Sequence, residues 1–315
     1  MTEAEKQYID LYTEASEAIK EHSAEVMNAV RDRAFEDFRR QGFPTRKVER
    51  YKYTDMEKIF APNYGLNINR IEFPVDPYAA FRCDVPNLST LLYFVVNDAF
   101  YEKRLPNVQP EEGVVIGSLR KAAEEHPELI ARYYARIAKT EEDAITALNT
   151  MLAQDGLFIY VPKNVQMEKC VQIINILRAD VSMMVNRRVL IVMEEGAKAK
   201  FLFCDHTADD HDFLATQVIE AYVGDNASLD LYCMEETHYK NHRVSNVYIE
   251  QQRDSRVNHN VITLHNGVTR NRLDLVFKGE GAECYCSGCV IADRKQHVDN
   301  NTLCLLYTSP SPRDA

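Results

Sequence analysis

The sequence lacks any run of apolar residues long enough to cross a membrane as a helix. Its first ten residues, M-T-E-A-E-K-Q-Y-I-D, are acidic and contain no apolar segment of the kind that directs secretion. Most of the eight cysteines are scattered singly, unlike the evenly spaced framework of a small secreted disulfide protein. We therefore expect a cytoplasmic protein with reduced thiols and no membrane partner.

The chain also contains fewer basic than acidic residues. The chain has 37 lysines and arginines against 48 aspartates and glutamates, which gives a formal net charge of −11 at pH 7. Nucleic acids and anionic membranes require a dense cationic surface, which this composition does not suggest. The expected partners are proteins or small molecules, and nucleic acid is excluded.

Several catalytic signatures are absent as well. The sequence has no G-x-x-x-x-G-K-[ST] for nucleotide phosphates, no G-x-S-x-G elbow and no H-E-x-x-H. The stretch G-E-G-A-E-C lacks the third glycine of a dinucleotide-binding loop. Because these signatures are absent, any nucleotide hydrolysis must come from a partner.

The first half of the chain is dominated by helical patterns. Apolar residues recur at helical spacing over residues 8–38 and again over residues 119–137. A short third pattern covers residues 145–152, and we expect Thr140 to cap it. Between the first two patterns, only L-L-Y-F-V-V-N-D over residues 91–98 predicts a strand.

The second half of the chain predicts strands and contains a weak internal repeat. Four segments, which begin at Glu194, Gly224, Gln252 and Gly279, each place a polar turn and a small residue before an alternating strand. They recur at roughly 27 to 30 residues, a spacing typical of repeat architectures. The predicted fold is mainly β, a parallel β-helix preceded by an α-helical N-terminal region, with a β-sandwich as the alternative. In a β-helix the inward residues form ladders, for which the candidates are Ala199 and Phe201, Leu229 and Leu231, and Cys284 and Cys286.

A cluster of cysteines raises the question of a metal site. Cys284 and Cys286 are two residues apart, so on a strand they point the same way, into the predicted core. Cys289 lies beyond Gly288, and three converging thiolates would require a bulge. We favour core packing over zinc or cluster ligation, which leaves these cysteines and His297 as weak metal candidates.

The polar stretch Q-H-V-D-N-N-T also alternates along a predicted strand. His297, Asp299 and Asn301 share one face, which is either a functional surface or, as we favour, part of a structural asparagine ladder. Two other stretches combine histidines with acidic residues or neighbouring polar groups, and we interpret them as solvated loops rather than metal sites. They are C-D-H-T-A-D-D-H-D, with His206 and His211, and E-T-H-Y-K-N-H, with His238 and His242.

Three segments together resemble the SufB/SufD family of iron–sulfur cluster assembly proteins. They are R-K-V-E-R-Y-K-Y-T-D-M (residues 46–56), A-L-N-T-M-L-A-Q-D-G-L-F-I-Y-V-P-K-N-V (147–165), and R-N-R-L-D-L-V-F-K-G-E-G-A-E through Q-H-V-D-N-N-T (270–302). The first segment is more typical of SufD than of SufB. The resemblance implies a right-handed parallel β-helix that acts as a non-enzymatic scaffold beside SufB and the ATPase SufC. It further implies that an iron–sulfur cluster is present only transiently, at the level of the complex, and that flavin is a candidate cofactor.

Two alternatives to a SufD-like scaffold remain. One is a SufB-like cluster-building subunit. The other is an unrelated β-helix that binds metal or acts on carbohydrate. A carbohydrate-active site would need paired carboxylates on one ladder, where we expect leucine, cysteine and alanine instead.

The expected domains follow from these patterns. We predict an N-terminal helical region at 1–60, a mixed α/β region at 61–156, an incomplete β-helix core at 157–302 and a non-native tail at 303–315. From Cys304 onward the tail resembles a translated sequencing adaptor, so we expect a C-terminally truncated family member and exclude Cys304 from the chemistry. An uncovered β-helix end is expected to make such a chain prone to aggregation.

Overall fold

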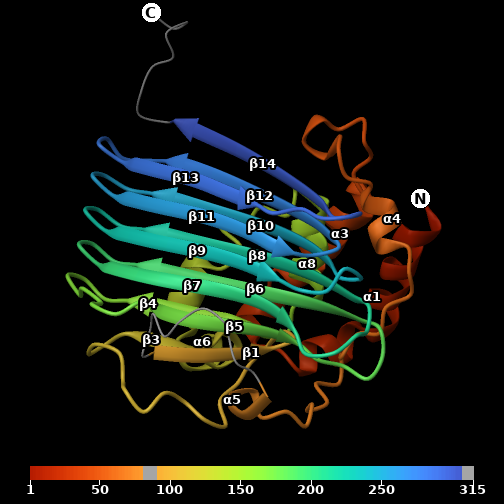
Figure 1. The fold of residues 1–315 in the computed structure, drawn as a ribbon, viewed down its shortest axis with the longest axis horizontal. Helices are drawn as coiled ribbons and strands as arrows, with labels where there is room; N and C mark the ends of the chain where they lie inside the picture. The colour runs from red at the N-terminus through yellow and green to blue at the C-terminus, as the bar shows by residue number, and fades with distance from the viewer. Residues whose placement is uncertain (81–90, 307–315) are drawn as a thin grey trace, which may run out of the picture.

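Two facing β-sheets dominate the molecule, and a layer of helices lies on one side of them (Figure 1). The structure is a computed structural model that describes residues 1–80 and 91–306. Most of the predicted tail, from residue 307 onward, lies outside the described residues. None of the helices in these two ranges is both long and apolar enough to cross a membrane.

Helices dominate the first half of the chain, where three short strands separate two groups of helices, and strands alone make up the described part of the second half. The helices are α1 (Glu3–Glu21), α2 (Glu25–Asn28), α3 (Arg31–Gln41), a 3₁₀ turn (Glu49–Tyr51), α4 (Met56–Phe60), α5 (Pro77–Ala80), α6 (Leu119–Glu125), α7 (Pro127–Tyr133) and α8 (Ala144–Leu152). The early strands are β1 (Leu91–Val96), β2 (Ala99–Phe100), β3 (Val115–Ser118), β4 (Leu157–Val161) and β5 (Val171–Leu177). The later strands are β6 (Met183–Met193), β7 (Lys198–Thr207), β8 (Phe213–Val223), β9 (Ser228–Glu236), β10 (His242–Gln251), β11 (Arg256–His265), β12 (Val268–Phe277), β13 (Glu283–Val290) and β14 (His297–Leu306).

Strand pairing identifies the fold as a parallel β-helix. Sheet A has the order β14-β12-β10-β8-β6-β4-β3, and sheet B has the order β13-β11-β9-β7-β5-β1-β2. From β6 onward, each strand pairs in parallel with the strand two positions earlier, so one strand of each sheet makes one coil. The predicted parallel β-helix is confirmed, and the sandwich alternative is set aside. The predicted strand at residues 91–98 forms β1, which extends sheet B by parallel pairing with β5.

The inward ladders lie where the repeat predicts them. Ala199 stands in register with Leu229, and Phe201 with Leu231. The ladders continue through Val257 and His259 of β11 before they reach the two cysteines, Cys284 and Cys286. The repeat therefore places the inward positions correctly.

The polar segments of the repeat form one turn that recurs between the two sheets. Backbone amides link successive turns, with N of Gly196 2.8 Å from O of Asp225 and N of Asn226 2.8 Å from O of Arg253. Each turn contains a residue with positive φ, a conformation that Gly, Asn and Asp adopt more readily than other residues. These residues are Asn164, Gly196, Asn226, Asp254 and Gly281.

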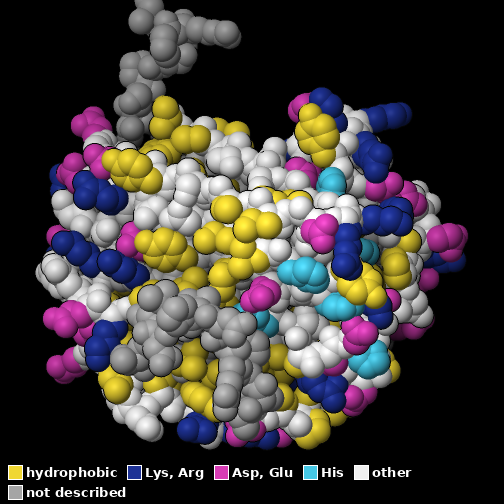
Figure 2. All heavy atoms as spheres, in the orientation of Figure 1, with side chains coloured by type: hydrophobic (Ala, Val, Ile, Leu, Met, Phe, Trp, Pro, Cys, Tyr) yellow, Lys and Arg dark blue, Asp and Glu magenta, His cyan; other side chains and the backbone are white. Residues whose placement is uncertain are grey.

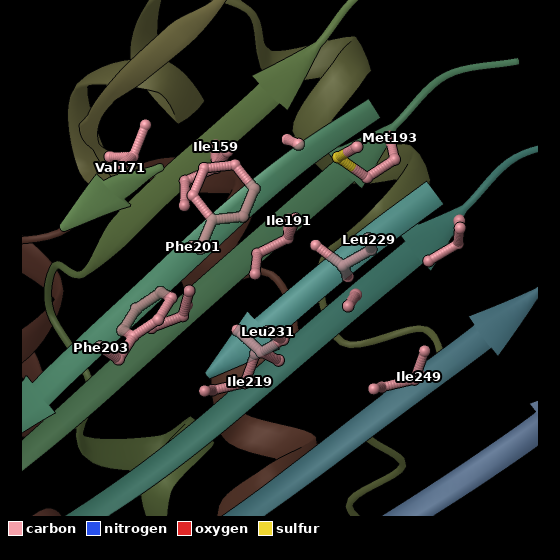
Figure 3. Packing of buried hydrophobic residues seen from close by; sticks show 14 of the residues in the cluster. Ile159, Val171, Ile191, Met193, Phe201, Phe203, Ile219, Leu229, Leu231 and Ile249 are labelled. Carbon is pink, nitrogen blue, oxygen red and sulfur yellow. The ribbon is translucent and has the colours of Figure 1, made fainter. Parts of the chain in front are cut away.

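The main hydrophobic core fills the space between the sheets (Figure 3). Phe201 of sheet B and Ile191 and Ile219 of sheet A are all 0% exposed. Burying one such side chain contributes about 1.5–3 kcal/mol relative to leaving it in water. The alternation of inward and outward residues along each strand therefore carries most of the hydrophobic stabilisation.

Helices cover the outer face of sheet A. A second core joins α1, α3, α4 and α8 to residues of β6, β8 and β10, such as Met184, Leu214 and Val244. Helix α8 begins at Asp143, whose carboxylate accepts the N–H of Thr146 at 2.9 Å. The prediction that Thr140 caps this helix is wrong, because the Thr140 hydroxyl instead donates to Asp37 at 2.6 Å.

Candidate functional site

The polar stretch of β14 meets the N-terminal region on the outer face of sheet A. The buried hydroxyl of Thr54 donates to Oδ2 of Asp299 at 2.6 Å, and Nε2 of His297 lies 3.2 Å from the same hydroxyl. Because the hydroxyl has a single proton, which it donates to Asp299, the imidazole must donate to the hydroxyl oxygen. His297 and Asp299 therefore hold residues 46–56 against the β-helix. The third residue predicted for this face, Asn301, follows on the same side of β14, in register with Arg272.

The asparagine ladder that we favoured runs on the opposite face of β14. Nδ2 of Asn271 donates to Oδ1 of Asn300 at 2.9 Å, and Nη1 of Arg243 donates to Oδ1 of Asn271 at 2.7 Å. These residues point between the sheets. The predicted ladder is therefore present in this stretch, at Asn300, and it lies on the face opposite to His297, Asp299 and Asn301.

Arginine side chains complete the docking of the N-terminal segment. The Arg270 guanidinium lies over the Tyr51 ring, 3.9 Å from its centroid, and Nη2 donates to O of Arg50 at 2.5 Å. The Tyr51 hydroxyl donates to Asp143, which also accepts from Nη1 of Arg272 at 2.7 Å. Two segments of the family resemblance, residues 46–56 and 270–302, thus share one buried network with the cap of α8.

The electrostatics of this network favour a charged Asp143. Burial raises the pKa of its carboxyl group, but Arg272 and the hydrogen bond from Tyr51 outweigh burial and hold the pKa below its usual value. Tyr51 responds in the opposite way, because burial and the neighbouring carboxylate raise its pKa well above the ordinary value. The network is therefore a fixed ion pair with a neutral phenol, and it stabilises the structure rather than offering a reactive group.

The three clustered cysteines do not converge on one point. Cys284 and Cys286 point between the sheets, whereas Cys289 stands in register with Ile262 and faces outward. The register runs unbroken from Glu283 to Val290, so the bulge that a three-thiolate site would need is absent from this strand. The expectation of a buried strand is wrong in part, because β13 is the outermost strand of sheet B and leaves the Cys286 and Cys289 side chains exposed.

The histidines of the two other predicted stretches lie in separate elements. The face seen in Figure 2 carries several histidine side chains beside an apolar area. His206 belongs to β7 and is buried, so the prediction that Cys204 to Asp212 forms one loop is wrong for its first four residues. His238 does lie in a loop, where its Nε2 pairs with Oδ1 of Asp210 at 2.8 Å. His211 also lies in a loop, whereas His242 begins β10. Within residues 1–80 and 91–306, no group of three or more histidine, cysteine, aspartate or glutamate side chains could hold a metal ion.

Sequence reasoning missed a charged cluster inside the β-helix. Asp205 and Glu235 stand in register on neighbouring strands, and both are almost fully buried. Asp205 pairs with Nη1 of Arg187 at 2.6 Å and Nε of Arg243 at 2.8 Å, and Thr269 donates to Glu235 at 2.8 Å. The sequence did contain a signal for this cluster, because charged residues occupy inward positions of otherwise apolar strands. The ladders therefore do carry a carboxylate pair, contrary to the expectation, but arginines neutralise it and the sheets enclose it.

Burial affects the two carboxylates of this cluster differently. It raises the pKa of Glu235 to about 7, because Arg243 and Thr269 only partly offset the loss of water. Asp205 has two arginine partners, which outweigh burial and lower its pKa. One carboxylate is thus fixed in charge and the other titrates near neutral pH.

Comparison with known families covers nearly the whole chain. Residues 2–173 match the SufBD protein N-terminal region, and residues 175–309 match the SufBD core domain of the SUF system of FeS cluster assembly. The chain belongs to the SufBD family. Membership sets aside an unrelated metal-binding or carbohydrate-active β-helix. The core-domain match begins within β5, where the coils of the SufBD β-helix become regular.

Relatives of this SufBD chain come from bacteria and plants. It is 29% identical over 185 residues to the iron–sulfur cluster assembly protein SufD of Bacillus subtilis, which covers 58% of this chain and 41% of that protein. It is 32% identical over 124 residues to the SufBD family protein slr0074 of Synechocystis, covering 38% and 25% of the two chains. The chloroplastic SufBD family protein ABCI8 of Arabidopsis thaliana is 32% identical over 122 residues, covering 38% and 21%. Each match thus spans less than half of the relative's length.

Proposed function

We propose that the chain acts in iron–sulfur cluster assembly as a non-catalytic scaffold subunit beside SufB and the ATPase SufC. The observation that carries this proposal is the docking of residues 46–56, the segment more typical of SufD, on the outer face of β12 and β14. Thr54, Asp299 and Arg270 hold the segment through buried polar contacts. The SufD-like segment and the SufBD core therefore form one structural unit.

The proposed role is mechanical. The ion pairs of the network around Asp143 join the helices to sheet A. Those of the cluster around Asp205 join the two sheets. A stack of paired coils resists bending, and movement driven by ATP hydrolysis in SufC would displace it as a rigid body. The iron–sulfur cluster is cargo of the complex in this proposal, and the chain alone holds none.

A flavin does not fit the groove beside α2, α6 and α7. A flavin phosphate calls for backbone N–H groups or cations gathered at one place. The groove of about 590 Å³ beside α2, α6 and α7 is instead lined by two carboxylates, Glu25 and Glu124, with Arg136 as its cation. We derive no step through a flavin.

The test is anaerobic co-expression of the chain with SufB and SufC, followed by purification on an affinity tag carried by SufC. We expect the chain to co-purify with both partners and, when purified alone, to contain no stoichiometric iron or sulfide. A stoichiometric cluster on the isolated chain would favour a SufB-like cluster-building subunit instead. Failure to join SufB and SufC would contradict the scaffold role.

A matched pair of variants connects this test to the structure. Thr54→Ala removes the hydroxyl that contacts Asp299 and His297, so we expect it to loosen the docked segment and reduce co-purification. Thr45→Ala is the control, because Thr45 is exposed in the same region and makes no contact with the β-helix among the described hydrogen bonds. Equal recovery with both variants would show that the docked segment does not matter for complex formation.

A further inference from the structure

Two thiols that the proposed function does not use meet on the inner face of β13. Sγ of Cys284 and Sγ of Cys286 lie 3.5 Å apart. Both side chains point between the sheets, because they stand in register with Val257 and His259, two buried residues of β11. A rigid strand thus holds two soft ligands side by side.

An imidazole, that of His259, stands in register with Cys286 on the neighbouring strand β11. His259 is 3% exposed, and its Nδ1 lies 3.2 Å from O of Leu231. Because a carbonyl oxygen can only accept, Nδ1 carries the proton and Nε2 keeps a lone pair that can bind a metal. His259 and Cys286 line the same cavity of about 270 Å³ between the sheets.

The number and type of these ligands select the class of metal. Cys289 faces away from the cavity, so a third thiolate from this cluster is not available. Structural zinc requires a closed set of four ligands, and calcium and magnesium require oxygen ligands. Thiolates favour monovalent copper, which accepts a low coordination number.

We propose that the two thiols of Cys284 and Cys286 form a two-coordinate binding site for a soft monovalent metal ion of the copper(I) class. Binding forms two metal–sulfur bonds and releases the two thiol protons to solvent, and no electron is transferred.

The test is an anaerobic titration of the full 315-residue chain with copper(I), in competition with a chromophoric copper(I) chelator. We expect a single tight site whose affinity falls by more than roughly 100-fold in the double variant Cys284→Ser/Cys286→Ser. Loss of an outer-shell partner alone costs about 10–100-fold, and here two direct ligands are lost. His259→Phe should weaken binding less than the double variant does.

One single variant serves as the matched control. Cys289→Ser removes a thiol from the same strand but from its opposite face. Cys304 of β14 is not a suitable control, because it also points between the sheets and interacts electrostatically with Cys284 and Cys286. The Cys289→Ser variant should keep the wild-type affinity.

The proposal is overturned if the double variant binds copper(I) as tightly as the wild type, or if Cys289→Ser weakens binding as much as the double variant does. Thermal melting separates loss of ligand from loss of fold. If the double variant melts at a lower temperature than the wild type, Cys286→Ser alone carries the test, because the Cys286 side chain is exposed and its replacement disturbs little packing.

Discussion

At the scale of single residues, Glu235 is a carboxylate that works against stability at neutral pH. Its pKa of about 7 in the folded chain lies above the value near 4.3 expected after unfolding. Between these two values the folded chain binds more protons than the unfolded chain, so stability falls as the pH rises. Above about pH 7 the full cost of a buried charge remains.

We therefore expect Glu235→Gln to stabilise the chain at pH 8 by roughly 1–3 kcal/mol, and to have little effect near pH 5. Arg243 keeps its other partner, Asp205, so the substitution does not leave that arginine unpaired. Urea unfolding at the two pH values measures the difference. Equal effects of the substitution at pH 5 and pH 8 would contradict the raised pKa.

From the sequence alone, the face of a strand on which a side chain lies is easier to predict than the residue that it meets on the neighbouring strand. Alternation along each strand predicted that Cys284 and Cys286 share a face, and this is confirmed. The pairing of Asp205 with Glu235 depends on a register across residues far apart in sequence, which a weak repeat does not define. Exposure of Cys286 depends on the neighbours of β13 in sheet B, which the pattern of its own strand does not contain.

At the scale of elements, the recurring turn can be tested with a pair of glycines. Gly196 has φ of +69°, and a Cβ there would lie 2.4 Å from Oδ1 of Asn164 in the preceding turn. Gly196→Ala should therefore lower the free energy of unfolding by about 1–2 kcal/mol, the cost of a left-handed residue with a side chain.

The matched control is Gly117→Ala in β3. A Cβ at Gly117 would meet no atom within 4 Å, and its φ lies outside the strained range. We expect a change within roughly ±0.5 kcal/mol, as for an ordinary surface substitution. Chemical denaturation of both variants measures the difference, and equal losses would mean that the turn tolerates a side chain.

Periodic elements were predicted better than the contacts that join them. The helical patterns before Gly42 and the strand at 91–98 are confirmed, because local spacing alone defines them. We predicted Thr140 as the cap of α8, but Asp143 directly precedes the helix and its carboxylate accepts the N–H of Thr146. The ion pair between Asp143 and Arg272 could not be predicted from local spacing, because Arg272 lies far along the chain.

At the scale of the whole molecule, the coils should differ in how readily they open. Strands β6, β8 and β10 have a neighbour on each side and helices over their outer face, whereas β13 and β14 each have one neighbour. Backbone hydrogen bonds with fewer buried neighbours open more easily.

We expect amide hydrogen exchange to be slowest in β6 and β8 and to become faster toward β13 and β14. Exchange read out by mass spectrometry resolves these strands as separate peptides. Phe201→Ala should lower protection throughout the coils that share its core, whereas Tyr285→Ala, at a residue 61% exposed, should leave the gradient unchanged. Uniform protection from β6 to β14 would contradict a stack that opens coil by coil.

The recurring turn has a consequence for how such a protein can change in length. On one side of the stack, the turns from β6 to β7, from β8 to β9 and from β10 to β11 have the same length, residues 194–197, 224–227 and 252–255. The turn from β12 to β13, residues 278–282, is one residue longer, and Cys284 still keeps its inward register with Val257. On the other side, the connections between β7 and β8, β9 and β10, β11 and β12, and β13 and β14 differ in length. From β6 onward, the length of the connections therefore varies by one residue at most on the edge that carries the recurring turn, and by more on the opposite edge, so changes in length are concentrated on one edge of the molecule.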